Sequence, residues 1–186
     1  YDMAMPYNIC GGLQDNYSWC GPSRKTGGAI TNHDWFTLSG GDGFVTQQDP
    51  RDPNIVYSQS QFGNIARFDR RSGERLYLRG YEQKDNAALR FDWDAALIIS
   101  SHDHTRLYHG ANVVLRSDDR GESWREISPD LPRGVPTTLH PLMERTWSID
   151  EMVTKASFAH IVSLAESPLD ENRLYAGSGD GLLHVT

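Results

Sequence analysis

The sequence predicts an all-β chain built from repeated units of the β-propeller type. Residues Asp49–Asn64 align without a gap with residues Ser167–Leu182, matching Pro, Asp, Asn, Tyr, Ser and Gly at equivalent places. Each copy contains short apolar, β-branched or aromatic runs separated by turn residues, which is an all-β pattern. Units of roughly 40–50 residues with several strands each are typical of propeller blades.

When the repeated segments are aligned, three tyrosines fall at the same position and set the register of the repeat. Tyr57, Tyr108 and Tyr175 occupy the same place in three copies, and Cys10 takes that place in a weaker fourth copy. The anchors at 10, 57, 108 and 175 are 47, 51 and 67 residues apart. We therefore expect residues 1–186 to form a partial propeller of about four units.

Each unit is expected to place its strands in the same order. The first strand is an apolar run, such as Ala96–Ser100. A turn of Pro, Asp and Asn leads to the second strand, and a turn of Gly or Asn leads to the third. The predicted second strands are Ile55–Ser58 and Arg106–His109, and the third are Asn64–Phe68 and Val113–Arg116.

One segment, 134–159, interrupts the repeat and accounts for its longest interval. Ser148–Lys155 within it reads as a short helix, with Ser148 as the N-cap and acidic residues in the first turn. Insertions of this kind project from one face of a propeller, where binding loops are placed. We expect this segment to contact a partner or substrate.

Composition limits the classes of protein that fit. The 186 residues hold 18 Lys+Arg against 25 Asp+Glu, a net charge of −7, with 38% hydrophobic residues. This content favours a packed core over disorder, and the acidic balance disfavours nucleic-acid binding. No run is long enough for a membrane span. The chain begins at Tyr1 without a signal-peptide pattern, so we expect a fragment whose propeller is completed by missing sequence or by another chain.

The two cysteines leave two possibilities open. Nine residues separate Cys10 from Cys20 and none of them is His, which does not suit a zinc site. They form either a disulfide across a short hairpin or two buried thiols. A disulfide would favour an extracytoplasmic location, periplasmic or secreted.

The strongest motif is S-x-D-x-G-x-x-W, the Asp-box, after a predicted third strand. Its fixed positions are Ser117, Asp119, Gly121 and Trp124. Asp119 is expected to accept backbone N–H bonds in a tight hairpin, Gly121 to supply positive φ, and Trp124 to pack between blades. Residues 68–74 resemble a degenerate copy, so the motif is assigned a structural role.

These motifs resemble the sortilin-like and BNR-repeat propeller proteins of bacteria. The resemblance rests on the Asp-box, on Cys-Gly-Gly-Leu-Gln-Asp-Asn at 10–16 and on Tyr-His-Gly-Ala-Asn at 108–112, and it covers nearly the whole chain. It implies a large exported protein, often labelled a glycosyl hydrolase on the repeat alone. Related Asp-box propellers include sialidases, xyloglucan-cleaving hydrolases and sortilin, so the fold does not fix the function.

Carboxylates in glycine-rich turns are the weak catalytic candidates. A glycosidase needs two carboxylates across a cleft, roughly 5–9.5 Å apart. Asp15 and Asp42 lie in turns that a propeller face could present, and Asp180 is of the same kind. Each is more simply explained as a turn cap. Sialidase chemistry is disfavoured because the arginines are scattered.

Other candidates are an aromatic set and a histidine pair. Trp19, Trp35 and Trp93 stand near polar or acidic residues, where they would stack on a sugar or fill the space between blades. His102 and His104 flank Asp103, but that aspartate holds the turn position of the repeat, so we expect no metal site. No cofactor motif is present in the sequence.

The sequence therefore predicts a binding or interaction role toward a carbohydrate or a protein. The alternative is a glycoside hydrolase with paired carboxylates on loops such as those of Asp15 and Asp42. A further alternative is an accessory subunit of a larger complex, which predicts an extensive apolar contact surface.

Overall fold

Four antiparallel sheets make up the fold. The structure is a computed structural model that describes residues 1–78, 89–133 and 160–186. Within these ranges the sheets follow one another in sequence, and each strand pairs only inside its own sheet. The prediction of an all-β fold of consecutive, blade-type sheets is confirmed. The insertion 134–159 and the helix expected at 148–155 lie outside the described residues.

The outer two sheets have three strands each and the inner two have four. The first sheet contains β1 (Asn8–Gly12), β2 (Ser18–Pro22) and β3 (Phe36–Ser39). The second contains β4 (Thr46–Gln48), β5 (Ile55–Ser60), β6 (Asn64–Asp69) and β7 (Arg75–Tyr77). The third contains β8 (Leu97–Ile99), β9 (Leu107–Gly110), β10 (Val114–Ser117) and β11 (Arg125–Glu126). The fourth contains β12 (Ile161–Ser167), β13 (Asp170–Ser178) and β14 (Leu183–Val185).

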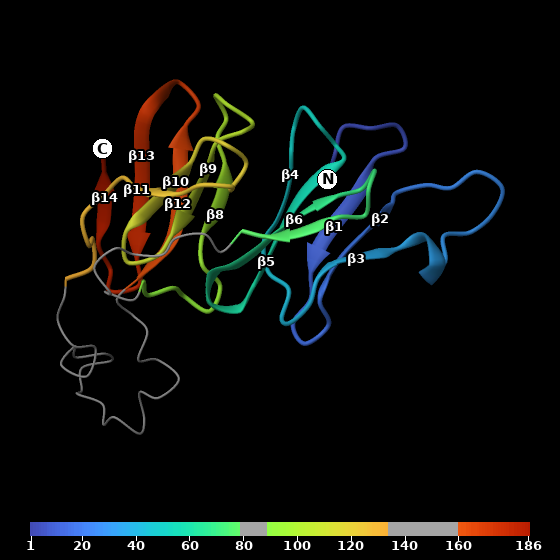
Figure 1. Ribbon diagram of the computed structural model, residues 1–186, viewed down its shortest axis with the longest axis horizontal. Helices are drawn as coiled ribbons and strands as arrows, with labels where there is room; N and C mark the ends of the chain where they lie inside the picture. Colours follow the sequence, from blue (N-terminus) through green and yellow to red (C-terminus); the bar gives the residue numbers. More distant parts are fainter. Residues whose placement is uncertain (79–88, 134–159) are drawn as a thin grey trace.

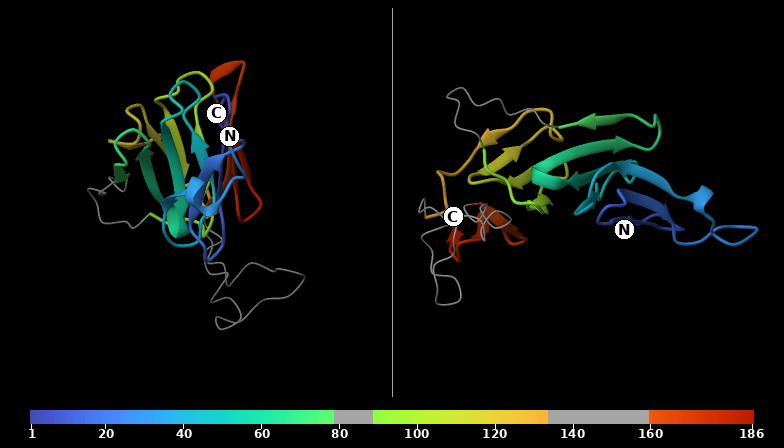
Figure 2. Two further views of the ribbon diagram at one scale, coloured as in Figure 1. Left: turned by 90° about the vertical axis from the view of Figure 1, so that its right-hand side faces the viewer. Right: turned by 90° about the horizontal axis from the view of Figure 1, so that it is seen from below.

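The sheets stand side by side in chain order (Figure 1) and, seen from below, follow an arc (Figure 2). The strands predicted from sequence are present to within one or two residues, as β5, β6, β8, β9 and β10. Two short 3-10 turns also occur, η1 (Asn32–Asp34) and η2 (Gln61–Gly63). Each strand presents alternate residues to the sheets on either side, so every interior sheet is buried on both faces.

The core consists of apolar layers between neighbouring sheets. Tyr57 of β5 packs with Leu97 and Leu107 of the third sheet. Tyr108 of β9 packs with Ile161 of the fourth sheet in the same way. Both tyrosines are essentially unexposed, at 0% and 1%. The three anchor tyrosines therefore lie in the second strand of their sheets, and Tyr57 and Tyr108 face the following sheet, whereas Cys10 lies in β1.

Two carboxylates, a half-buried one and a fully buried one, link neighbouring sheets. Glu166 of β12 accepts hydrogen bonds from the Ser100 hydroxyl at 2.9 Å, the Ser101 N–H at 2.7 Å and the Tyr108 hydroxyl at 3.1 Å. Burial raises the pKa of Glu166, but these hydrogen bonds outweigh it and hold the pKa below its ordinary value. Asp49, 1% exposed, lies 2.9 Å from His104 Nδ1 and links the second sheet to the third.

His109 of β9 is completely buried between the second and third sheets. Its Nδ1 lies 2.9 Å from the Ala96 carbonyl oxygen and its Nε2 lies 3.2 Å from that of Gly63. The ring stacks on Phe91 with centroids 5.0 Å apart. Burial lowers the pKa of His109 to about 4, so the folded protein keeps this imidazole neutral at pH 7.

We expect His109 to make stability depend on pH. The unfolded chain takes up a proton near pH 6.5 and the folded chain only near pH 4, so stability falls as the pH drops between these values. The two pKa values correspond to a loss of about 3 kcal/mol. Urea unfolding at several pH values measures it. His109→Gln should show a pH dependence smaller by this amount, and equal dependence in both proteins would contradict the prediction.

Candidate functional site

Four connections gather at one end of the molecule, the lower edge in Figure 1: those after β1 and β5, and those before β4 and β8. We call this end the loop face, and define it by residues 12–17, 40–45, 61–63 and 89–96. Antiparallel strands alternate in direction, so these turns from three sheets must emerge on the same side. The face brings together residues that are far apart in the sequence.

Asp15 and Asp42 meet on the loop face. The Asp42 Oδ1 accepts the backbone N–H of Asp15 at 2.7 Å, and Asp42 is only 5% exposed. Two backbone bonds, from Tyr17 N–H to the Gly41 carbonyl oxygen at 3.0 Å and from Gly43 N–H to that of Leu13 at 2.9 Å, join the same two loops. Asp15 itself has φ 62°, a left-handed conformation that this bracing holds in place.

The electrostatics of this pair differ from those of two independent acids. A side-chain hydrogen bond with Asp42, together with its negative charge, raises the pKa of Asp15. The Asp42 carboxylate is already engaged by the Asp15 backbone N–H, so the two groups are not the independent pair, roughly 5–9.5 Å apart, that glycosidases place across a cleft. The pair therefore braces two loops, with Asp42 as the buried cap and Asp15 as the exposed member.

Asp180, the third acidic candidate, lies in the hairpin between β13 and β14. It accepts the Arg133 N–H at 2.7 Å and a hydrogen bond from the Ser178 hydroxyl. Burial raises the pKa of Asp180, but these bonds outweigh it and lower the pKa. This carboxylate caps its own turn, and the structure places it on a different sheet from Asp15 and Asp42.

Three aromatic rings form an exposed cluster on the loop face. Trp93 packs edge-on against Phe62 with centroids 4.8 Å apart and against Phe44 with centroids 6.4 Å apart. Trp93 is 44% exposed and Phe62 is 47% exposed. The Phe62 N–H donates to the Trp93 carbonyl oxygen at 3.3 Å, and Phe62 has φ 58°. The sequence singled out Trp93 but neither phenylalanine, because nothing local marks them as neighbours.

A second group that the sequence missed is Asp92 with His160. His160 Nε2 contacts the Asp92 carboxylate, and His160 is 2% exposed. The hydrogen bond to His160 lowers the pKa of Asp92 despite burial. The His160 Nδ1 is buried and has no hydrogen-bond partner among the described residues. The only sequence signal was that each residue precedes the strand that opens its sheet, β8 for Asp92 and β12 for His160.

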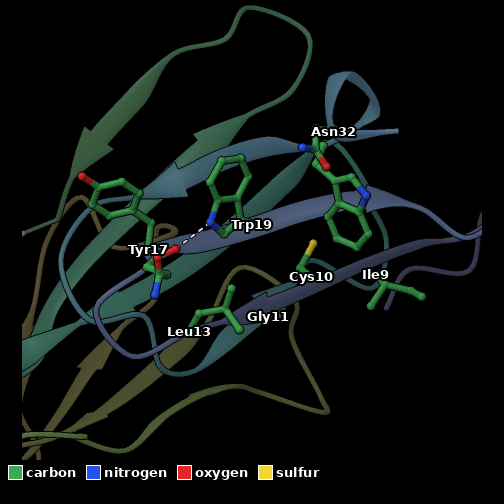
Figure 3. Close-up of a pocket in the computed structure, with 9 residues that line it drawn as sticks. Ile9, Cys10, Gly11, Leu13, Tyr17, Trp19 and Asn32 are labelled. Atoms are coloured by element: carbon green, nitrogen blue, oxygen red, sulfur yellow. Dashed lines mark hydrogen bonds between the residues drawn. The ribbon is translucent and has the colours of Figure 1, made fainter. Parts of the chain in front are cut away.

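Trp19 and Trp35 lie away from Trp93, on the outer face of the first sheet. They line an open pocket of about 710 Å³ together with Ile9, Leu13 and Tyr17 (Figure 3). The Trp19 indole N–H donates to the Asn16 carbonyl oxygen at 2.6 Å. The wall of this pocket is β1, where a disulfide joins Cys10 to its cross-strand neighbour Cys20.

The turn between β10 and β11 lies at the end opposite the loop face. The Ser117 hydroxyl donates to the Asp119 carboxylate at 2.8 Å and accepts the Gly121 N–H at 2.8 Å. Asp119 in turn accepts the Ser123 N–H at 2.9 Å. The Trp124 indole N–H donates to the Gly121 carbonyl oxygen at 3.0 Å, and its ring packs against the core between the second and third sheets.

The two histidines beside Asp103 have separate partners. His102 Nε2 lies 2.8 Å from the Ser167 carbonyl oxygen of the fourth sheet, while His104 Nδ1 contacts Asp49 of the second sheet. Asp103 accepts the Thr105 N–H at 2.9 Å, as a turn residue. Across the described ranges no three His, Cys, Asp or Glu side chains form a metal-binding group, and no helix is long and apolar enough to cross a membrane.

Comparisons with known proteins give structural resemblances only. No protein-family model matches the chain, and no curated protein matches its sequence. A GH74 xyloglucanase from Xanthomonas campestris has a TM-score of 0.49 and 12% identity over 90% of this chain and 25% of its own. The GH74 enzyme of Niastella koreensis has a TM-score of 0.49 and 12% identity over 93% of this chain and 27% of its own. A chain of a nidogen/laminin complex has a TM-score of 0.49 and 10% identity over 96% of this chain and 61% of its own. The chain thus spans about a quarter of the length of the two GH74 enzymes.

We expect Gly121 to be the most sensitive position of its turn. It has φ 89°, and a Cβ there would lie 2.4 Å from Leu78 Cδ1 in the neighbouring sheet. Gly121→Ala should therefore lose about 1–2 kcal/mol for the left-handed backbone and about 1–3 kcal/mol more for overpacking.

Gly73→Ala is the matched control, because Gly73 has φ 74° and open space around its Cβ position. It should lose only the backbone cost of about 1–2 kcal/mol. Chemical denaturation of both variants measures the difference. Equal losses would show that the contact with Leu78 has no energetic weight.

Proposed function

We propose that the protein is a carbohydrate-binding module of the propeller type, with its ligand site on the loop face. The observation that supports this most directly is the cluster of Phe44, Phe62 and Trp93, in which Phe62 and Trp93 remain exposed although both phenylalanines pack against the tryptophan. Aromatic rings with an apolar face suit the C–H face of a sugar ring.

Polar groups next to the cluster supply hydrogen-bonding partners. Asp15 is exposed next to the loop that carries Phe44. Its backbone N–H is hydrogen-bonded to Asp42, which lies two residues before Phe44 in that loop. Gln61 lies directly over Gly41: its side-chain Oε1 is 2.5 Å from the position that a Cβ on Gly41 would take. A sugar on the rings would therefore find carboxylate acceptors and amide donors at its hydroxyls. The Asp42 cap and the loop-to-loop bonds hold these groups in place before a ligand arrives, which lowers the cost of binding.

We also propose that the chain belongs to the sortilin-like or BNR-repeat group and works outside the cytoplasm. The self-bonded turn of Ser117, Asp119 and Gly121 suits the Asp-box read from sequence. The disulfide between Cys10 and Cys20 suits an oxidising compartment.

A glycoside hydrolase is the second candidate, and one observation favours it. The raised pKa of Asp15 beside a second carboxyl group is the condition that a general acid requires. The hydrogen bond from the Asp15 backbone N–H to the Asp42 carboxylate and the burial of Asp42 speak against it, because Asp42 is committed to holding the turn and is not open to a sugar. Binding without turnover is the proposal that fits both facts.

Trp93→Ala should weaken glycan binding on an array and by calorimetry, with a loss of about 1–3 kcal/mol for a sugar-stacking ring. Tyr7→Ala is the matched control, since Tyr7 is also 44% exposed but precedes β1, at the opposite end of the sheet. It should bind as well as the wild type. Binding retained in Trp93→Ala, or the absence of any glycan ligand for the wild type, would refute the proposed site.

Asp15→Asn separates binding from hydrolysis. We expect the wild type to leave bound oligosaccharides intact over long incubation, as measured by reducing-end release, and the variant to bind with unchanged stoichiometry. Reducing ends released by the wild type and lost in Asp15→Asn would instead assign the loop face to a hydrolase.

A further inference from the structure

His160 is a buried histidine whose polar ring is unfavourable for stability alone. It directly precedes β12 and is 2% exposed, and its Nδ1 has no hydrogen-bond partner in the part of the chain that the structure describes. A buried polar atom without a partner costs free energy of folding, which a nonpolar ring of similar shape would avoid. Its Nε2, in contrast, contacts the carboxylate of Asp92 on the loop face. This contact explains the histidine better than packing does.

The backbone around His160 is fixed to two sheets. The Ile161 N–H donates to the Ala111 carbonyl oxygen at 2.7 Å, which ties the start of β12 to the hairpin between β9 and β10. The Gly179 N–H donates to the His160 carbonyl oxygen at 3.0 Å, which ties it to the segment after β13. Ile161 is also fully buried, against Tyr108 of the third sheet. The imidazole is therefore presented to the loop face from a fixed position.

The two carboxylate oxygens of Asp92 bind different groups. The Oδ2 atom contacts His160 Nε2, and the Oδ1 atom accepts the Asp94 backbone N–H at 2.8 Å. An aspartate that accepts the N–H two residues further on closes a tight turn, and Trp93 lies at its centre. The Trp93 carbonyl oxygen in turn accepts the Phe62 N–H at 3.3 Å. A continuous set of contacts thus runs from the fourth sheet into the aromatic cluster.

We propose that His160 is a positioning residue for the glycan site: by holding Asp92, it fixes the turn that presents the ring of Trp93. This inference rests on the proposed function, because it concerns the same aromatic cluster. A turn held only by its own bonds on an exposed loop opens readily. The second contact, from a buried and anchored imidazole, keeps the turn closed before a sugar arrives, so less conformational entropy is lost on binding.

His160→Phe tests the positioning role, because it keeps a ring in the core and removes the donor to Asp92. Affinity for the oligosaccharide that binds the wild type most strongly on the array, measured by calorimetry, should fall about three- to tenfold. The free energy of unfolding should stay equal or rise, since no unpaired nitrogen remains in the core. His160→Gln, whose side-chain amide donates in place of the imidazole, should recover most of the affinity. Equal affinity losses in both variants would contradict a role for the donor.

His104→Phe is the matched control. His104 also joins two sheets through a carboxylate, with its Nδ1 2.9 Å from Asp49, but at the end opposite the loop face. Its replacement should leave glycan affinity unchanged. An affinity loss equal to that of His160→Phe would show that any weakened contact between sheets impairs binding, and would overturn the proposal.

Asp92→Ala shows whether His160 acts through Asp92. Alone, it should weaken glycan binding at least as much as His160→Phe, because it removes both bonds of the turn. The double variant should then bind no more weakly than Asp92→Ala, since the imidazole has lost the group it holds. Additive losses in the double variant would mean that the two residues act independently, which the proposal does not allow.

Amide hydrogen exchange of the unliganded protein distinguishes the positioning role from glycan binding itself. The Asp94 and Phe62 N–H groups should exchange about three- to tenfold faster in His160→Phe, whereas that of Tyr17, bonded to Gly41 in other loops, should not change. Faster exchange in a protein that binds no glycan would remove the proposed function and still support His160 as the residue that orders this turn. Unchanged exchange with unchanged glycan affinity would overturn the positioning role and leave the glycan site standing.

Discussion

Packing of the anchor tyrosines into the next sheet is the interaction on which the rest of this structure depends. Tyr57 and Tyr108 each fill the space between two sheets, against Leu97 and Leu107 in one case and Ile161 in the other. Small sheets of three or four strands are marginal alone, so each gains its stability from burying both faces. The arc seen in Figure 2 follows from repeating one contact with one geometry.

Polar groups fix how far each sheet can slide on its neighbour. Apolar packing is not directional, but Glu166 and Asp49 accept hydrogen bonds from specific atoms of the adjoining sheet. Near the loop face, the buried imidazole of His109 lies between two backbone carbonyl oxygens, those of Ala96 and of Gly63 in the adjoining sheet. The two ends of the molecule are thereby held in register, so that loops from three sheets meet in a reproducible arrangement.

The loop face combines rigidity with exposed rings. Asp42 is taken up in holding the Asp15 turn, and the same bracing keeps Phe44 beside Trp93. A group committed to structure cannot also serve as an independent catalytic acid, and this is the physical reason for preferring a binding site. The opposite end, where Ser117 and Asp119 close a turn on themselves, has its polar groups satisfied internally.

The sequence by itself determined the strands, the repeat and the turn chemistry, because these depend on neighbours a few residues apart. Apolar runs such as Ile55–Ser58 and the glycine of the turn at 117–124 are local signals. Only the tertiary structure decided that Asp15 meets Asp42, that Phe44 and Phe62 join Trp93, and that Trp19 lies on another face. Those contacts join different loops and sheets, and no periodicity records them.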